Sequence, residues 1–224
     1  IGKETENEEE VLEEMLEVSE RMREALIIVE TAPTDLDRLI TLWELSKKLD
    51  RKLILTESQA HLIRRLRQAG VKGLPSLEDF YLLLSRRRED EEKSPNWWWA
   101  ESKLSRRREA IKELIAEMED KSGPEAVIWG ERREAISREP YSYLLVTYSA
   151  ARSLMELLPP DGPFPIGFIM SRSEPFSEQM VMGFDKLLSW LSLYGVRKYY
   201  RIHTSGHMDP EQVGAVVEAI SPSK

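Results

Sequence analysis

One stretch of the sequence decides the fold, and it comes early in the chain: residues 25–40, ALIIVETAPTDLDRLI. Its first five residues form a short apolar run rich in β-branched side chains, which is typical of a buried strand. Thr34 is suited to be the N-cap of a following helix, because Asp37 stands three residues later, at the N3 position. The stretch therefore predicts a strand, a polar turn and a helix.

The same pattern recurs along the chain. Four further apolar runs predict strands, at residues 52–55, 143–146, 166–170 and 199–202. Helical periodicity follows each run, at residues 56–69, 150–158, 177–194 and 210–219. Two weaker strands and one charged helix are predicted at residues 80–84, 126–129 and 104–119. Because alternating strands and helices build βαβ units, we expect an α/β, Rossmann-like three-layer domain with a mainly parallel sheet and helices on both faces.

Polar residues stand where the predicted strands end. Right-handed crossovers bring the carboxyl ends of parallel strands to one edge of the sheet, which is where open α/β sheets bind ligands. The residues at these ends are Glu30, Thr31, Thr56, Thr147, Ser171 and His203. The sequence therefore predicts a site along this edge.

The composition of the chain excludes several kinds of functional site. The 224 residues include no Cys and three His, which excludes disulfides, thiolate zinc sites, a Cys nucleophile and any site with four imidazoles from this chain. The formal charge is −8, but residues 1–24 carry ten Glu against three basic residues, a net of −7. The rest of the chain is close to neutral, so the acidic total does not argue against a nucleic-acid partner. No apolar run is long enough for a membrane span.

The most specific motif is HTSGHMDPEQ at residues 203–212. A strand ends at His203, Gly206 permits a tight turn, and Asp209 can cap the next helix with Pro210 at N1. The turn thus lies near a helix N-terminus, whose N–H groups attract anions, and two imidazoles stand beside it. This combination suits a phosphate group. The alternatives are that both His merely cap the turn, or that they form a metal pair, which Gly206 argues against.

Several segments together resemble the β-CASP domain of metallo-β-lactamase-fold hydrolases that process nucleic acids, such as RNase J and the cleavage-factor endonucleases. The matching segments are SRSEPFSE at 171–178, WL at 190–191, HTSGH at 203–207, IVETAPTDLDRL at 28–39 and RKLILT at 51–56. The resemblance implies that residues 1–195 form a β-CASP domain, with residues 1–24 as an acidic first helix. Residues 196–224 would be a strand-turn-helix that returns to a metallo-β-lactamase core absent from this chain.

The resemblance also implies roles for individual residues. In the family, the two domains enclose a cleft and a two-zinc centre on the lactamase core hydrolyses a phosphodiester bond. His207 would donate a proton near the scissile phosphate, or hydrogen-bond to that phosphate. The expected phosphate-binding residues are His203, Thr204, Ser205, Gly206, Ser171 and Ser173. Asp35 and Arg38 would lie in the cleft, against substrate or the partner domain.

The family's zinc motif, HxHxDH, is absent from this sequence. We therefore expect no metal site or cofactor in this segment, with two zinc ions held by a longer parent protein, and no hydrolysis by the segment alone. The expected partners are single-stranded RNA, or DNA as the alternative, the missing lactamase core and a second copy of the chain, in the cytoplasm and without a membrane. The competing interpretations are a non-catalytic nucleic-acid-binding or protein-interaction module, and a nucleotide-binding domain, for which no glycine-rich phosphate loop is found. Trp97, Trp98 and Trp99 are predicted to contact a missing domain or partner, with stacking on RNA bases as the alternative.

Overall fold

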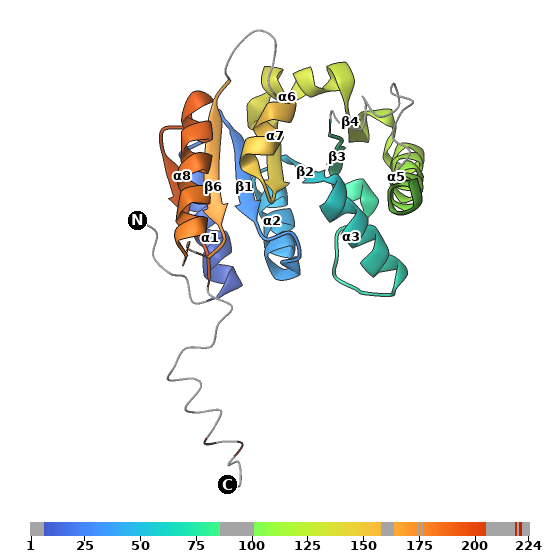
Figure 1. Ribbon diagram of the computed structural model, residues 1–224, viewed down its shortest axis with the longest axis horizontal. Coiled ribbons are helices and arrows are strands. Elements are labelled where there is room, and N and C mark those ends of the chain that lie inside the picture. The colour runs from blue at the N-terminus through green and yellow to red at the C-terminus, as the bar shows by residue number, and fades with distance from the viewer. Residues whose placement is uncertain are drawn as a thin grey trace.

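The computed structural model describes residues 7–85, 101–157, 164–173, 175, 177–204, 218 and 220. Within this part, seven strands form one parallel sheet in the order β4-β3-β2-β5-β1-β6-β7 (Figure 1). The strands are β1 Leu26–Thr31, β2 Lys52–Thr56, β3 Tyr81–Leu83, β4 Val127–Ile128, β5 Tyr143–Thr147, β6 Ile166–Ser171 and β7 Tyr199–Arg201. All five predicted strands and both weaker ones are confirmed.

The helices cover both faces of this sheet, which confirms the predicted Rossmann-like three-layer fold. They are α1 Glu8–Glu20, α2 Leu36–Lys48, α3 Glu57–Gln68, α5 Glu101–Ser122, α6 Glu134–Arg138, α7 Ala150–Leu157 and α8 Glu178–Leu193. Short 3₁₀ turns lie at Leu77–Asp79, Pro124–Ala126, Gly130–Arg133 and Pro140–Ser142. Within the predicted helix at residues 210–219 the structure describes residue 218 alone, and the three tryptophans at 97–99 lie outside the described residues.

Side-chain alternation along the strands creates two cores. On β1, Ile27 and Val29 pack against α1, α2, α3 and α5, whereas Leu26 and Ile28 pack against α6, α7 and α8. Because both faces of a parallel sheet are buried, each strand reads as a continuous apolar run, and this is why the strands could be found from sequence. Figure 1 shows α7 and α8 in front of the strands.

Side chains and glycines mark the helix ends. The side chain of Gln59 accepts the backbone N–H of Thr56 at 3.2 Å, as in a capping box at the start of α3, and Gly70 and Gly73 adopt φ of 86° and 80° after this helix. The predicted N-cap at Thr34 is wrong. Asp35 caps α2 instead, because its side chain accepts the Arg38 backbone N–H at 3.0 Å.

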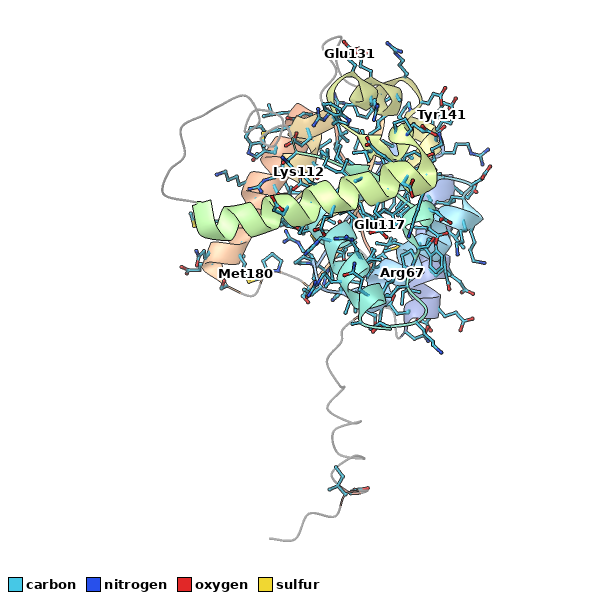
Figure 2. All side chains as sticks on the ribbon, turned by 90° about the vertical axis from the view of Figure 1, so that its right-hand side faces the viewer. Arg67, Lys112, Glu117, Glu131, Tyr141 and Met180 are labelled. Carbon is cyan, nitrogen blue, oxygen red and sulfur yellow. The ribbon has the colours of Figure 1, made fainter. Side chains whose placement is uncertain are left out.

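The β4 end of the sheet is closed by α5, on which Figure 2 labels Lys112 and Glu117. Arg64 of α3 joins this helix by ion pairs to Glu113 at 3.2 Å and Glu117 at 2.8 Å. Arg64 therefore links α3 to α5.

The chain changes faces at β1. From β1 it leaves to α2 on the first face, whereas β5 and β6, the two neighbours of β1, continue into α7 and α8 on the second face. The connections separate at the carboxyl end of β1, and such switch points are where doubly wound sheets bind ligands. Among the described helices, none combines the length and apolar character needed to cross a bilayer.

Candidate functional site

The polar strand ends predicted from sequence do share one edge. In the sheet register Thr31 pairs with Ser171, and Glu30 pairs with Thr147 on the other side. This is the lower edge of the sheet in Figure 1. His203 follows β7, which pairs with β6. The edge therefore gathers residues from four strands at the point where the chain changes faces.

A buried network centred on Arg38 lies on the first face of this edge. The Arg38 side chain is 1% exposed and binds Glu8 with two nitrogens, Nη2 to Oε1 at 2.8 Å and Nε to Oε2 at 3.0 Å. Arg38 Nη1 also donates to the Ser171 hydroxyl and to the carbonyl of Ile202. Thr41 completes the network by donating to Glu8 Oε2 at 2.6 Å.

This network joins α1, α2, β6 and the segment after β7. Burial of Glu8 disfavours its charged form, but hydrogen bonds from Arg38 and Thr41 and the charge of Arg38 outweigh burial and lower the pKa of Glu8. Ser171 also donates to the Ile202 carbonyl at 2.7 Å. Since Ile202 immediately precedes His203, the network holds the backbone from which the histidine projects.

The network changes the interpretation of three predicted site residues. Ser171 is fully buried and its hydroxyl is hydrogen-bonded within the network, so its role at this edge is structural. Arg38 is likewise internal, and Asp35 serves as the cap of α2. Sequence reasoning missed Glu8, because nothing distinguishes it locally from the other glutamates of α1.

Ser173 and His203 meet above this network. The Ser173 hydroxyl lies 3.3 Å from His203 Nε2, and Ser173 is exposed. His203 Nδ1 is buried and has no hydrogen-bond partner among the described residues. Burial, and after it the charge of Arg38, lowers the pKa of His203. A neutral imidazole and a hydroxyl in contact can both hydrogen-bond the oxygens of a phosphate group.

The lowered pKa of His203 predicts a pH dependence of stability. Protonation of this ring favours the unfolded chain, so the protein is expected to lose free energy of unfolding as the pH falls from about 7.5 to about 5. Urea unfolding of the His203→Gln variant across this range should show a smaller loss. Ser173→Ala should follow the wild type, because burial and not the hydroxyl is the main cause. Equal pH profiles for wild type and His203→Gln would contradict the assignment.

A second pair of charges lies on the other face of the edge. Glu30 is 2% exposed; it accepts the backbone N–H of Ala150 at 2.7 Å and pairs with Arg172 at 2.8 Å. Burial raises the pKa of Glu30, against the effects of the Ala150 N–H and of Arg172. The Arg172 side chain stays 41% exposed. Glu30 thus anchors a cation at the rim, next to Ser173.

Hydroxyl groups fill the rest of the edge. Thr147 accepts the Ser149 N–H at 3.0 Å and the Ser153 hydroxyl at 2.8 Å. The Thr31 hydroxyl is buried and, within the described ranges, has no hydrogen-bond partner. Thr204 is half-buried beside His203. Ser205, Gly206 and His207 lie outside the described residues, so their predicted roles stay predictions.

A two-zinc centre requires a cluster of metal-ligating side chains. In the part of the chain that the structure describes, no group of three or more His, Cys, Asp or Glu side chains could hold a metal ion. The whole sequence offers three His and no Cys. The Arg172, Ser173 and His203 side chains, here called the rim triad, are instead hydrogen-bonding and cationic groups of the kind that bind an anion.

Comparison with known proteins supports the fold. No protein-family model matches the chain, and no curated protein matches it. Among solved structures, the chain is similar to a protein of unknown function from Enterococcus faecalis V583, with a TM-score of 0.54 and 14% sequence identity. The match covers 99% of this chain and 41% of that protein, so the chain spans less than half of its structural neighbour's length. At this identity the match bears on the architecture, which is the α/β fold described above.

Proposed function

We propose that this chain is the substrate-clamping β-CASP portion of a zinc-dependent ribonuclease. The observation that carries the proposal is the rim triad: the exposed Ser173 hydroxyl lies 3.3 Å from the half-buried His203, and the preceding residue, Arg172, is half-exposed and paired with Glu30. The same residues fall in two of the segments that resemble the family, 171–178 and 203–207. The domain boundary proposed after residue 195 precedes β7. This strand pairs with β6, in the sheet formed by the residues before the boundary.

In this proposal the rim triad binds one phosphate of the RNA backbone. Arg172 supplies the positive charge, Ser173 donates a hydrogen bond, and His203 bonds a phosphate oxygen through its imidazole. The Arg38 network holds the triad in place by fixing the Ser171 and Ile202 backbone. His207 is proposed to donate a proton to the leaving oxygen. Zinc would be held by a separate lactamase core, because this chain lacks the donor set.

The salt dependence of RNA binding tests whether the rim triad binds a phosphate of the RNA backbone. A labelled single-stranded RNA is titrated with the 224-residue chain at several salt concentrations, and fluorescence anisotropy gives the affinity. Loss of one phosphate contact lowers the slope of log K against log salt by about 0.7 for single strands. We expect this change in Arg172→Gln, together with weaker binding in Ser173→Ala.

The matched control is Arg197→Gln, because Arg197 is an exposed arginine that precedes β7, at the opposite edge of the sheet. This variant should keep the wild-type slope. Equal slopes for Arg172→Gln and Arg197→Gln, or no RNA binding by the wild type, would overturn the clamp. Titrating single-stranded DNA of the same sequence separates RNA from DNA as the preferred partner.

A further inference from the structure

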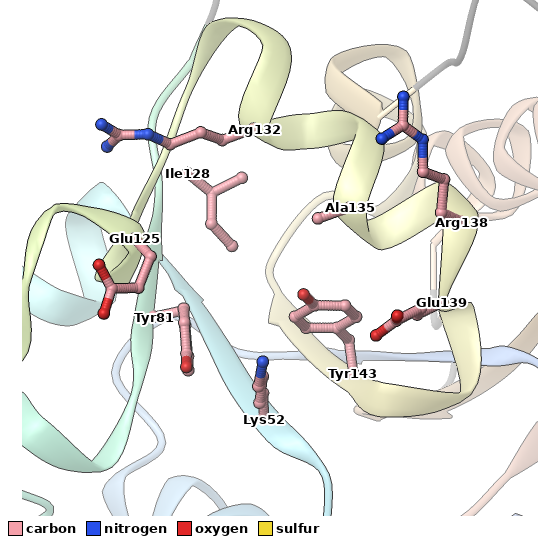
Figure 3. Close-up of a pocket in the computed structure, with 9 residues that line it drawn as sticks. All are labelled: Lys52, Tyr81, Glu125, Ile128, Arg132, Ala135, Arg138, Glu139 and Tyr143. Carbon is pink, nitrogen blue, oxygen red and sulfur yellow. The ribbon is translucent and has the colours of Figure 1, made fainter.

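A cavity of about 420 Å³ lies at the amino edge of the sheet, on the side away from the rim triad. Its wall comes from the first residues of β2, β3 and β5 and from the segment around α6 (Figure 3). The lining residues are Lys52, Tyr81, Glu125, Ile128, Arg132, Ala135, Arg138, Glu139 and Tyr143. Its volume falls within the range of small-molecule sites, roughly 300–1,000 Å³.

The exposed side chain of Lys52 lines this cavity. The ammonium of Lys52 lies 5.4 Å from the Tyr81 ring centre and 5.5 Å from the Tyr143 ring centre. In the described part of the chain, no carboxylate lies within ion-pair distance of it. Figure 3 shows the ammonium rising between the two rings toward the middle of the cavity. An anionic group can therefore bind Lys52 without displacing an internal partner.

The two arginines of the lining are already bound elsewhere. Arg132 donates to the Val127 carbonyl at 3.1 Å and to the Pro124 carbonyl, and Arg138 pairs with Glu134 at 2.6 Å. Figure 3 shows both guanidinium groups directed away from the centre. They add positive charge at the rim, so Lys52 is the group that contacts an anion.

The other walls suit a flat ring and a sugar. Tyr81 and Tyr143 stand edge to face, with ring centres 6.4 Å apart, and Ile128 and Ala135 supply apolar surface. Glu139 lies beside Tyr143, and Figure 3 shows its carboxylate directed toward the cavity. Aromatic faces stack on nucleobases, and a carboxylate is the usual acceptor for ribose hydroxyls in α/β nucleotide sites. Burial raises the pKa of Tyr143, so its hydroxyl stays a donor.

We propose that this cavity binds one nucleoside monophosphate, with the phosphate on Lys52, the ribose hydroxyls on Glu139 and the base against the tyrosine rings. A bare inorganic anion would leave most of the cavity and its aromatic wall unused. A longer nucleotide would bring further negative charge to a lining that already holds Glu125 and Glu139. The site is separate from the rim triad and does not depend on the function proposed for it.

Isothermal titration of the 224-residue chain tests this site, with AMP, adenosine, ribose 5-phosphate and inorganic phosphate as probes. We expect AMP to bind more tightly than any of the other three. Lys52→Gln should weaken AMP binding by about tenfold or more, since a charge-assisted hydrogen bond is lost, and should leave adenosine binding unchanged. The matched control is Lys112→Gln, on the exposed surface of α5, which should bind AMP as the wild type does (Figure 2).

The Tyr81→Leu variant distinguishes contacts to the base from contacts to the phosphate. It should weaken AMP and adenosine binding alike and leave ribose 5-phosphate binding unchanged, with circular dichroism confirming that each variant is folded. Equal AMP affinity in Lys52→Gln and Lys112→Gln would overturn the site, as would absence of AMP binding by the wild type. Because Arg172→Gln changes RNA binding at the other edge, failure here and failure of the clamp are distinguishable.

Discussion

Replacing Arg38 with methionine is expected to lower the free energy of unfolding by about 3 kcal/mol, which lies at the lower end for breaking a buried ion pair. The methionine can fill much of the space but donates no hydrogen bond. The variant therefore removes both arginine hydrogen bonds to Glu8, which keeps the one from Thr41. It also removes the hydrogen bonds from Arg38 to the Ser171 hydroxyl and to the Ile202 carbonyl. The value stays near the lower end because the Glu8 side chain is 34% exposed and water can reach it.

Urea denaturation measures this effect, and an exposed pair supplies the control. Arg21 and Glu17 form an ion pair on α1 with side chains 58% and 68% exposed, so Arg21→Met should cost about 0.5 kcal/mol or less. Glu8→Gln and the double variant complete a thermodynamic cycle. Because the two residues share one network, we expect a coupling energy of about 1–3 kcal/mol. A loss in Arg38→Met no greater than in Arg21→Met would show that the network does not hold the edge together.

Replacing His207 with alanine is expected to slow RNA cleavage by roughly two to four orders of magnitude, the usual contribution of a general acid. The measurement requires a zinc-loaded protein that joins this chain to a lactamase core. The free energy of unfolding should stay close to that of the wild type. The basis is the HTSGH turn and its resemblance to the family, since His207 lies outside the described residues.

The pH profile distinguishes a proton donor from a structural role. Loss of a general acid removes the fall in rate at high pH, whereas a general weakening of the site lowers the rate at every pH. Lys112→Gln, far from the motif in the sequence and exposed on α5, should cleave at the wild-type rate. Unchanged turnover in His207→Ala would remove the catalytic role. A wild-type protein that binds RNA but cleaves none would favour the non-catalytic module.

The fold could be predicted because its signals are local. A buried parallel strand appears as an apolar run and a surface helix as a periodic one, so residues 25–40 alone indicated the βα unit. The gathering of Thr31, Ser171 and His203 at one edge also followed, since the handedness of crossovers places all carboxyl ends together. The N-cap at Asp35 was missed because Thr34 is equally suited to cap a helix by residue type.

The partners of individual side chains could not be predicted. Arg38 looked like a candidate for substrate contact, but it is bound to Glu8, which lies 30 residues away in the sequence. The amino-edge cavity likewise unites Lys52, Tyr81 and Tyr143 from three strands. No spacing in the sequence connects these residues, and β5 enters the sheet between β2 and β1 although it follows both in the chain.

By itself, the sequence determined that this chain is a parallel α/β protein with polar strand ends along one edge, because backbone geometry and burial act over a few neighbouring residues. Only the tertiary structure decided which polar groups are used inside the protein and which stay available at the surface. The side chains of Arg38 and Ser171 are buried and form internal hydrogen bonds. The side chains of Arg172, Ser173 and Lys52 remain accessible to solvent. That division depends on strand order and packing between distant segments, since a buried polar group must find its partner wherever the fold supplies one.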